Sequence, residues 1–212
     1  MRGAVNSYME YAIDYAAAGM YNEASLLLGF VTEDSEITYP MVYYALGYFA
    51  MKQGNEVAAL DYFRKAEMMA PDYCFPNKLE EVLMLQEAMR MNKEGSKAPY
   101  YLGNFWYAAR IYDKAIACWE TSATLDGAYP TVLRNLSLAY YNKRNDSKKA
   151  VEMLEKAYAL DSSDARILME LDQLYKKLHY PHRQRLDFLE AHAEVVEQRD
   201  DLCIERITYT IS

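Results

Sequence analysis

The stretch PMVYYALGYFAMKQGNEVAALDYFRKAEMMAPDY, residues 40–73, determines how the rest of the chain is arranged. Large apolar and small residues recur in it at intervals of three and four, which places them on one face of each of two helices. Counted from Pro40 as position 1, they fill positions 4, 7, 8, 11, 20, 24, 27 and 32: Tyr43, Leu46, Gly47, Ala50, Ala59, Phe63, Ala66 and Pro71. The small residues at positions 8 and 20 allow two helices to approach closely. The stretch therefore predicts a tightly packed pair of antiparallel helices.

This pattern resembles the tetratricopeptide repeat (TPR), a unit of two antiparallel helices in 34 residues. Position 11 is the one signature position that departs from the pattern, because the small Ala50 stands where tyrosine is commoner. The resemblance implies an all-α fold in which helix pairs stack into a right-handed TPR superhelix, an α-α solenoid.

The same pattern recurs along the chain in steps of 34 or 35 residues, with one exception. We therefore expect residues 1–212 to form a single TPR array of about five helix pairs, with repeats near 5–39, 40–73, 96–129, 130–164 and 165–198 and a half repeat at 199–212. The exception is the 56-residue step from Pro40 to Ser96, whose surplus predicts one extra helix within residues 76–93. One inserted residue also lengthens the turn between Asn142 and Ser147.

The end of the chain carries two contrary signals. Residues 207–211 alternate between apolar and polar side chains, which on its own favours a strand. Their place in the array favours the first helix of a sixth repeat, cut before its second helix. We therefore expect a fragment of a longer polypeptide. Its last helix would leave apolar side chains partly uncovered and so favour weak self-association: Leu202, Ile204, Ile207 and Ile211.

A finer resemblance covers most of the chain. Residues 71–76, 98–106, 130–135, 164–175 and 199–202 are similar to the TPR region of large bacterial proteins, found among Bacteroidetes and others. In those proteins the array follows a β-rich domain similar to sugar mutarotases. The resemblance implies a link to carbohydrate metabolism, but it carries no activity over to these helices, because the residues of the sugar domain would lie outside them.

The composition excludes several classes of protein. A net charge of -8 argues against a general nucleic-acid binder, because affinity for phosphates comes from clustered Lys and Arg. No apolar run approaches the ~18 residues of a membrane span, and no signal segment precedes the first repeat. The three cysteines, Cys74, Cys118 and Cys203, are odd in number and far apart, which favours a reducing compartment, and hence the cytoplasm, over a disulfide framework.

No set of residues points to catalysis. His179 and His182 flank Pro181 in a turn and have no carboxylate or cysteine partner at helical spacing, so a metal site is not expected. No general base and orienting group accompany a serine or cysteine nucleophile, and no glycine-rich phosphate loop is present. We therefore expect a protein that is not an enzyme, with no cofactor and no metal.

A groove is the candidate functional surface. Positions 2, 5, 6, 9, 12 and 13 of each first helix lie beside the core stripe and line the concave side of a TPR superhelix. At these positions the chain brings together aromatic, Arg and amide side chains, which peptide grooves use as anchors: Tyr44, Tyr48, Tyr101, Asn104, Tyr107, Arg134, Asn135, Tyr141, Arg166 and Gln173. The other interpretation is that the tyrosines, 21 in the whole chain, pack on one another as core.

Charge also separates between the two kinds of turn. Turns between repeats carry acidic residues: Glu33, Asp34, Glu36, Asp72, Asp126, Asp161, Asp164, Glu197, Asp200 and Asp201. Turns within the fourth and fifth repeats carry basic residues: Lys143, Arg144, Lys148, Lys149, Lys176, Lys177, Arg183 and Arg185. Successive equivalent turns line one rim of a solenoid. The basic rim is explained either by solvated helix ends or by docking of an acidic partner.

The predicted function is a scaffold for protein interaction, which binds a peptide, a partner protein or another domain of the same chain in its groove. The alternative is a structural accessory, packed on a carbohydrate-active domain of the same longer polypeptide and binding no separate ligand. An adjoining β-rich domain with paired carboxylates would favour the accessory role.

Overall fold

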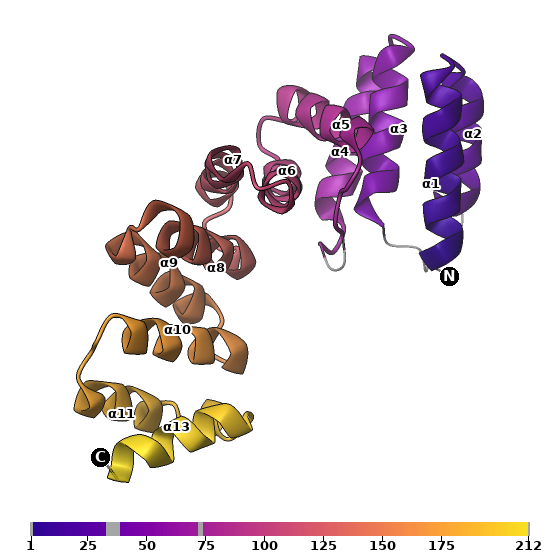
Figure 1. The fold of residues 1–212 in the computed structure, drawn as a ribbon. Coiled ribbons are helices and arrows are strands. Elements are labelled where there is room, and N and C mark those ends of the chain that lie inside the picture. Colours follow the sequence, from indigo (N-terminus) through magenta and orange to yellow (C-terminus); the bar gives the residue numbers. More distant parts are fainter. Residues whose placement is uncertain (1, 33–38, 72–73, 212) are drawn as a thin grey trace. The chain divides into compact units, whose positions relative to one another are not determined.

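The computed structural model describes residues 2–32, 39–71 and 74–211, and over these residues the regular structure is entirely helical (Figure 1). Some residues of the expected acidic turns lie outside the described residues: Glu33, Asp34, Glu36 and Asp72. The chain divides into two compact units, Met1–Leu125 and Asp126–Ser212. Each unit is built from packed helix pairs, which confirms the all-α fold. No helix among the described residues is both long and apolar enough to cross a membrane.

The first unit holds three helix pairs and one additional helix. The pairs are α1 (Arg2–Ala17) with α2 (Tyr21–Thr32), α3 (Pro40–Lys52) with α4 (Glu56–Met68), and α6 (Lys97–Ala108) with α7 (Tyr112–Leu125). The additional helix, α5 (Leu79–Met91), lies within the predicted range and packs on α3 and α6. Gly19 and Gly54 adopt φ = 78° in the turns of the first two pairs, a left-handed conformation that ends a helix at little cost when the residue is glycine.

A carboxylate joins the helices on either side of α5. At the end of α4, Glu67 Oε1 accepts hydrogen bonds from the backbone nitrogens of Ser96 and Lys97, both at 2.8 Å. The Lys97 ammonium donates in return to the backbone oxygens of Glu67 and Met69, both at 2.6 Å. Donors at the start of α6 are therefore satisfied by the end of α4, so these two helices are joined directly despite the inserted segment.

Glycines at position 8 set the spacing between paired helices. A Cβ on Gly47 would lie 2.5 Å from the ring of Phe63, and a Cβ on Gly103 would lie 2.4 Å from the ring of Trp119. Phe63 and Trp119 fill position 24 of their repeats and are buried. The close approach predicted from the small residue at position 8 is therefore observed in both pairs.

Gly103→Ala should lower the free energy of unfolding by about 1–3 kcal/mol, because the new methyl group forces the rigid Trp119 ring to move. Gly29→Ala is the matched control. Gly29 lies in α2 and a Cβ there would meet nothing within 4 Å, so that change should be neutral or stabilise by up to about 1 kcal/mol. Urea unfolding followed by tryptophan fluorescence reports on both variants. Equal effects of the two substitutions would contradict the packing role of Gly103.

The second unit begins with α8 (Pro130–Ala139), which continues into a π-helical segment, η1 (Tyr140–Arg144), and pairs with α9 (Ser147–Leu160). The π-helix accommodates the residue inserted in this turn: the Asn145 amide donates to the carbonyl of Tyr140, five residues earlier, and Asn145 itself is left-handed at φ = 53°. A one-residue insertion in the sequence is thus absorbed within the first helix of this pair.

The remaining helices are α10 (Ala165–Lys177), α11 (His182–Ala191), α12 (Ala193–Val196) and α13 (Asp200–Ile211). The last of these shows that residues 207–211 are helical, so the place in the array predicted their structure correctly and the local alternation did not. Helix α13 packs on α11 and α12 and buries Leu202 and Tyr209. Ile204 and Ile207 of the same helix are 63% and 57% exposed.

A charged network lies inside the second unit. Arg185 of α11 donates from Nε and Nη2 to the two carboxylate oxygens of Asp172 in α10, at 3.0 and 2.7 Å. The Tyr209 hydroxyl of α13 contacts both residues and also bonds to Glu205. Asp172 occupies position 8, where the earlier pairs have alanine, glycine or serine, and the network joins three helices of the unit.

Candidate functional site

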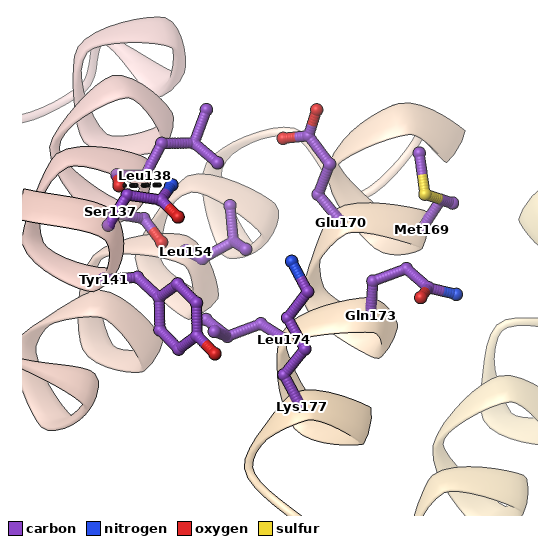
Figure 2. A pocket seen from close by; sticks show the side chains of 10 residues that line it. Ser137, Leu138, Tyr141, Leu154, Met169, Glu170, Gln173, Leu174 and Lys177 are labelled. Atoms are coloured by element: carbon purple, nitrogen blue, oxygen red, sulfur yellow. Dashed lines mark hydrogen bonds between the residues drawn. The ribbon is translucent and has the colours of Figure 1, made fainter. Parts of the chain in front are cut away.

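A pocket of about 110 Å³ opens in the second unit between the first helices of two successive repeats (Figure 2). One wall comes from α8 and η1 and the other from α10, with one residue of α9. The residues that line it are Ser137, Leu138, Tyr141, Asn142, Leu154, Met169, Glu170, Gln173, Leu174 and Lys177. Seven of these stand at first-helix positions 5, 6, 9, 12 or 13, the positions predicted to face the concave side.

The π-helical segment supplies part of this pocket. Tyr141 and Asn142 lie within it, and the Asn142 side chain donates to the backbone oxygen of Leu138 at 2.9 Å. Figure 2 shows the Tyr141 ring on one wall and the Lys177 side chain reaching across from α10. The Lys177 ammonium lies 5.5 Å from the centroid of that ring, a cation–π contact. The insertion that produces the π-helix therefore also positions two residues of the pocket.

Several charged side chains at the pocket form ion pairs with one another. Glu170 accepts hydrogen bonds from Arg134 through both carboxylate oxygens and from Arg166 at 3.3 Å. The Glu170 and Arg134 side chains are only 16% and 17% exposed, whereas Arg166 is 62% exposed. Two guanidinium groups from successive first helices therefore meet at one carboxylate.

A second carboxylate lies beyond Gln173. Glu205 of α13 accepts hydrogen bonds from Gln173 at 3.3 Å and from Lys176 at 2.6 Å. Partial burial acts to raise the pKa of Glu205, but these hydrogen bonds and the charges of Lys176 and Arg185 outweigh it, so the pKa is lowered. Glu205 is consequently ionised at neutral pH and holds Lys176.

Four of the predicted groove residues of the second unit line the pocket or bind a residue that lines it. Tyr141 and Gln173 line the pocket, and Arg134 and Arg166 bind its Glu170, while Asn135 is half-buried in α8. The sequence-based choice of aromatic, Arg and amide side chains omitted some lining residues that stand at the same positions: Leu138, Asn142, Met169 and Lys177. The repeat positions alone would have included them.

The predicted groove residues of the first unit are placed differently. Tyr44 and Tyr101 are 1% and 0% exposed, and their rings meet edge to face with centroids 6.0 Å apart. The expectation that these two side chains line an open groove is therefore corrected: they belong to the packing between α3 and α6.

The other three residues of that set are half-buried. Asn104 Oδ1 accepts a hydrogen bond from the indole nitrogen of Trp119 at 3.1 Å, and the ring of Tyr107 lies 5.2 Å from the Trp119 ring. Tyr48 packs on Phe49 and carries the ammonium of its neighbour Lys52 over its ring. Each of these side chains contributes to packing within the first unit.

Cysteine and histidine are the other side chains that could supply nucleophilic or metal-binding chemistry. Burial raises the pKa of Cys74 to about 12 and that of Cys118 to about 11, so both thiols are protonated at neutral pH and are poor nucleophiles. The His182 ring packs on Tyr209, and His192 packs on Tyr158. Across residues 2–32, 39–71 and 74–211, no three His, Cys, Asp or Glu side chains form a group that could hold a metal ion.

Solved structures share this architecture. A crystal structure of MamA matches 88% of this chain and 95% of its own, at 16% sequence identity and a TM-score of 0.52. MamA from Desulfovibrio magneticus RS-1, from residue 41 to its end, matches 93% of this chain and 97% of its own, at 17% identity and a TM-score of 0.50. These are TPR-like helical proteins. The chain has a TPR fold.

At such low identity the likeness of this TPR chain to MamA establishes the fold alone. No family model matches the chain. The finer resemblance, to Bacteroidetes-type proteins that carry a mutarotase-like domain, is not supported by these comparisons.

Proposed function

We propose that the chain is a scaffold for protein interaction and that the pocket between α8, η1 and α10 is its contact surface. The observation that carries the proposal is the convergence of residues from two successive first helices on one hollow, at the positions that face the concave side of a TPR array. The pocket combines apolar walls from Leu138 and Leu174, the ring of Tyr141 and a small number of polar groups, as binding sites do.

The size of the pocket favours a protein or peptide over a small molecule. A volume of about 110 Å³ is well below the ~300–1,000 Å³ of typical small-molecule sites. A hollow of this size has room for a side chain of a partner. Interfaces commonly place a few such anchor side chains in well-packed pockets.

Tyr141→Ala should weaken peptide binding at least tenfold, which corresponds to about 1.4 kcal/mol, because it removes one wall of the pocket. The test selects binders to the unaltered chain from a random peptide display library and measures the affinity of the selected peptides for each variant. Tyr141→Phe, which keeps the ring, should retain most of the affinity. Tyr15→Ala is the matched control, since Tyr15 is a partly exposed tyrosine of α1 in the other unit.

Two outcomes would count against this site. Selected peptides that bind the Tyr141→Ala and Tyr15→Ala variants equally well would place the contact surface elsewhere. Failure to select any peptide would remove the support for a peptide-binding scaffold and favour the accessory role beside a carbohydrate-active domain.

A further inference from the structure

The charges around the pocket do not balance. Arg134 and Arg166 share one carboxylate, that of Glu170, and Lys176 bonds to Glu205. Lys177 lines the pocket itself and is exposed, and among the described residues its ammonium makes a cation–π contact but no ion pair. Four cations therefore accompany two carboxylates on a chain whose net charge is -8.

Two of these cations retain binding capacity. A guanidinium group has five N–H donors, and Arg166 uses one of them, at 3.3 Å, while its side chain stays 62% exposed. The Lys177 ammonium has three donors and lies over an aromatic ring that accepts no conventional hydrogen bond. Both groups can bind a carboxylate of a partner without giving up an existing ion pair to Asp or Glu.

A basic edge continues from the pocket along the chain. Directly after Tyr141 and Asn142, the turn from η1 into α9 carries four exposed cations: Lys143, Arg144, Lys148 and Lys149. The acidic residue within this turn, Asp146, caps α9 by accepting a hydrogen bond from the Lys149 amide at 3.0 Å. The basic turn predicted from the sequence is thus exposed and follows directly from the pocket wall.

We propose that the partner of this pocket is an acidic protein segment, in which one apolar side chain enters between Leu138 and Leu174 while flanking Asp and Glu side chains bind Lys177, Arg166 and the basic edge. This inference rests on the proposed function of the pocket. Complementary charge steers such a segment to the pocket and sets its orientation. The apolar walls and the carboxylate of Glu170 in the pocket lining favour a protein segment over a polyphosphate chain.

Three peptide libraries test the partner class. Each has three random central positions, flanked on both sides by Asp and Glu, by Asn and Gln, or by Lys and Arg. We expect the acid-flanked library to be enriched at least tenfold over the amide-flanked library at low salt, with a smaller ratio at 0.5 M NaCl because screening weakens exposed charge pairs. Lys177→Gln and Arg166→Gln should each reduce the affinity of acid-flanked binders about threefold or more.

Lys156→Gln is the matched control and should leave the affinity unchanged, because Lys156 is an exposed lysine of α9 that already pairs with Glu152. Equal binding of amide-flanked peptides that still depends on Tyr141 would overturn the acidic partner and leave the pocket as a contact surface. No enrichment from any library would overturn both. A competition experiment adds phosphatidylserine vesicles or a single-stranded oligonucleotide to the bound acid-flanked peptides at equal charge concentration. Displacement of the peptides would show that any polyanion suffices. This result would also overturn the acidic protein segment.

Discussion

Asp172→Ala should destabilise the unit Asp126–Ser212 by about 3–5 kcal/mol, because it removes the carboxylate that accepts the two charge-assisted hydrogen bonds of the buried Arg185. The Arg185 side chain is only 2% exposed, and Asp172 receives both of its charged hydrogen bonds in a fork geometry. The loss should extend to α13, since the Tyr209 hydroxyl contacts the same two residues. Urea unfolding followed by circular dichroism measures the change. Hydrogen exchange shows which residues lose protection. Tryptophan fluorescence would not report on this unit, because both tryptophans lie in the other unit.

Two variants give this prediction its controls. Asp187→Ala breaks the exposed pair between Arg183 and Asp187, whose side chains are 80% and 53% exposed, and should cost well under about 1 kcal/mol.

Replacing the buried pair as a whole, with Asp172→Leu and Arg185→Met together, should recover most of the stability lost in Asp172→Ala. Burial raises the pKa of Asp172 even though Arg185 opposes this shift, so the ion pair does not fully offset the cost of desolvation. An Asp172→Ala variant no less stable than Asp187→Ala would contradict the role of the network.

Trp119→Ala should cost about 3–5 kcal/mol in the unit Met1–Leu125. The Trp119 side chain is 3% exposed and fills the space against Gly103. Its indole nitrogen donates to Asn104 Oδ1 at 3.1 Å and to the Tyr100 carbonyl at 3.3 Å. Truncation to alanine therefore leaves a cavity. It also leaves the Asn104 and Tyr100 oxygens without their indole donor. Thermal unfolding monitored by circular dichroism gives the magnitude.

Trp106→Ala is the natural control, because the Trp106 ring is half-exposed with the Lys114 ammonium 4.6 Å from its centroid. It should cost much less than the loss of Trp119. In a repeat array each element contacts only its neighbours, so the damage from Trp119→Ala should remain in the first unit at mild denaturant concentrations. Hydrogen exchange that showed equal loss of protection in residues 126–211 would contradict this expectation.

The parts of the fold that were predictable are those determined within one repeat. Gly47 with Phe63 and Gly103 with Trp119 are pairs 16 residues apart, and the helical period on each side of the short turn places them on the facing sides of their two helices. The extra helix was predictable for the same reason, since the apolar face of Leu79–Met91 is contained in the segment itself. Periodicity within one segment can be recognised without knowing how the neighbouring repeat packs.

The part that failed depends on what covers a repeat from outside. Tyr44 and Tyr101 occupy groove positions in their own helices, yet α5 packs on both α3 and α6. The loop before α5 places Cys74 beside Tyr101 and the backbone of Met41. A count of positions within a repeat cannot show where an inserted segment packs. The pairing of Arg134 with Glu170, 36 residues apart, is equally invisible to such a count.

The π-helical segment Tyr140–Arg144 has a consequence for how this repeat can change over evolutionary time. Deleting one residue from its turn would restore an ordinary α-helix and the regular repeat length. A π-helical turn is rare because it is less favourable than an α-helical one. The same deletion would rotate Tyr141 and Asn142 away from the positions they now occupy beside Leu138. Selection for stability and selection for the shape of this surface therefore act in opposite directions on a single residue.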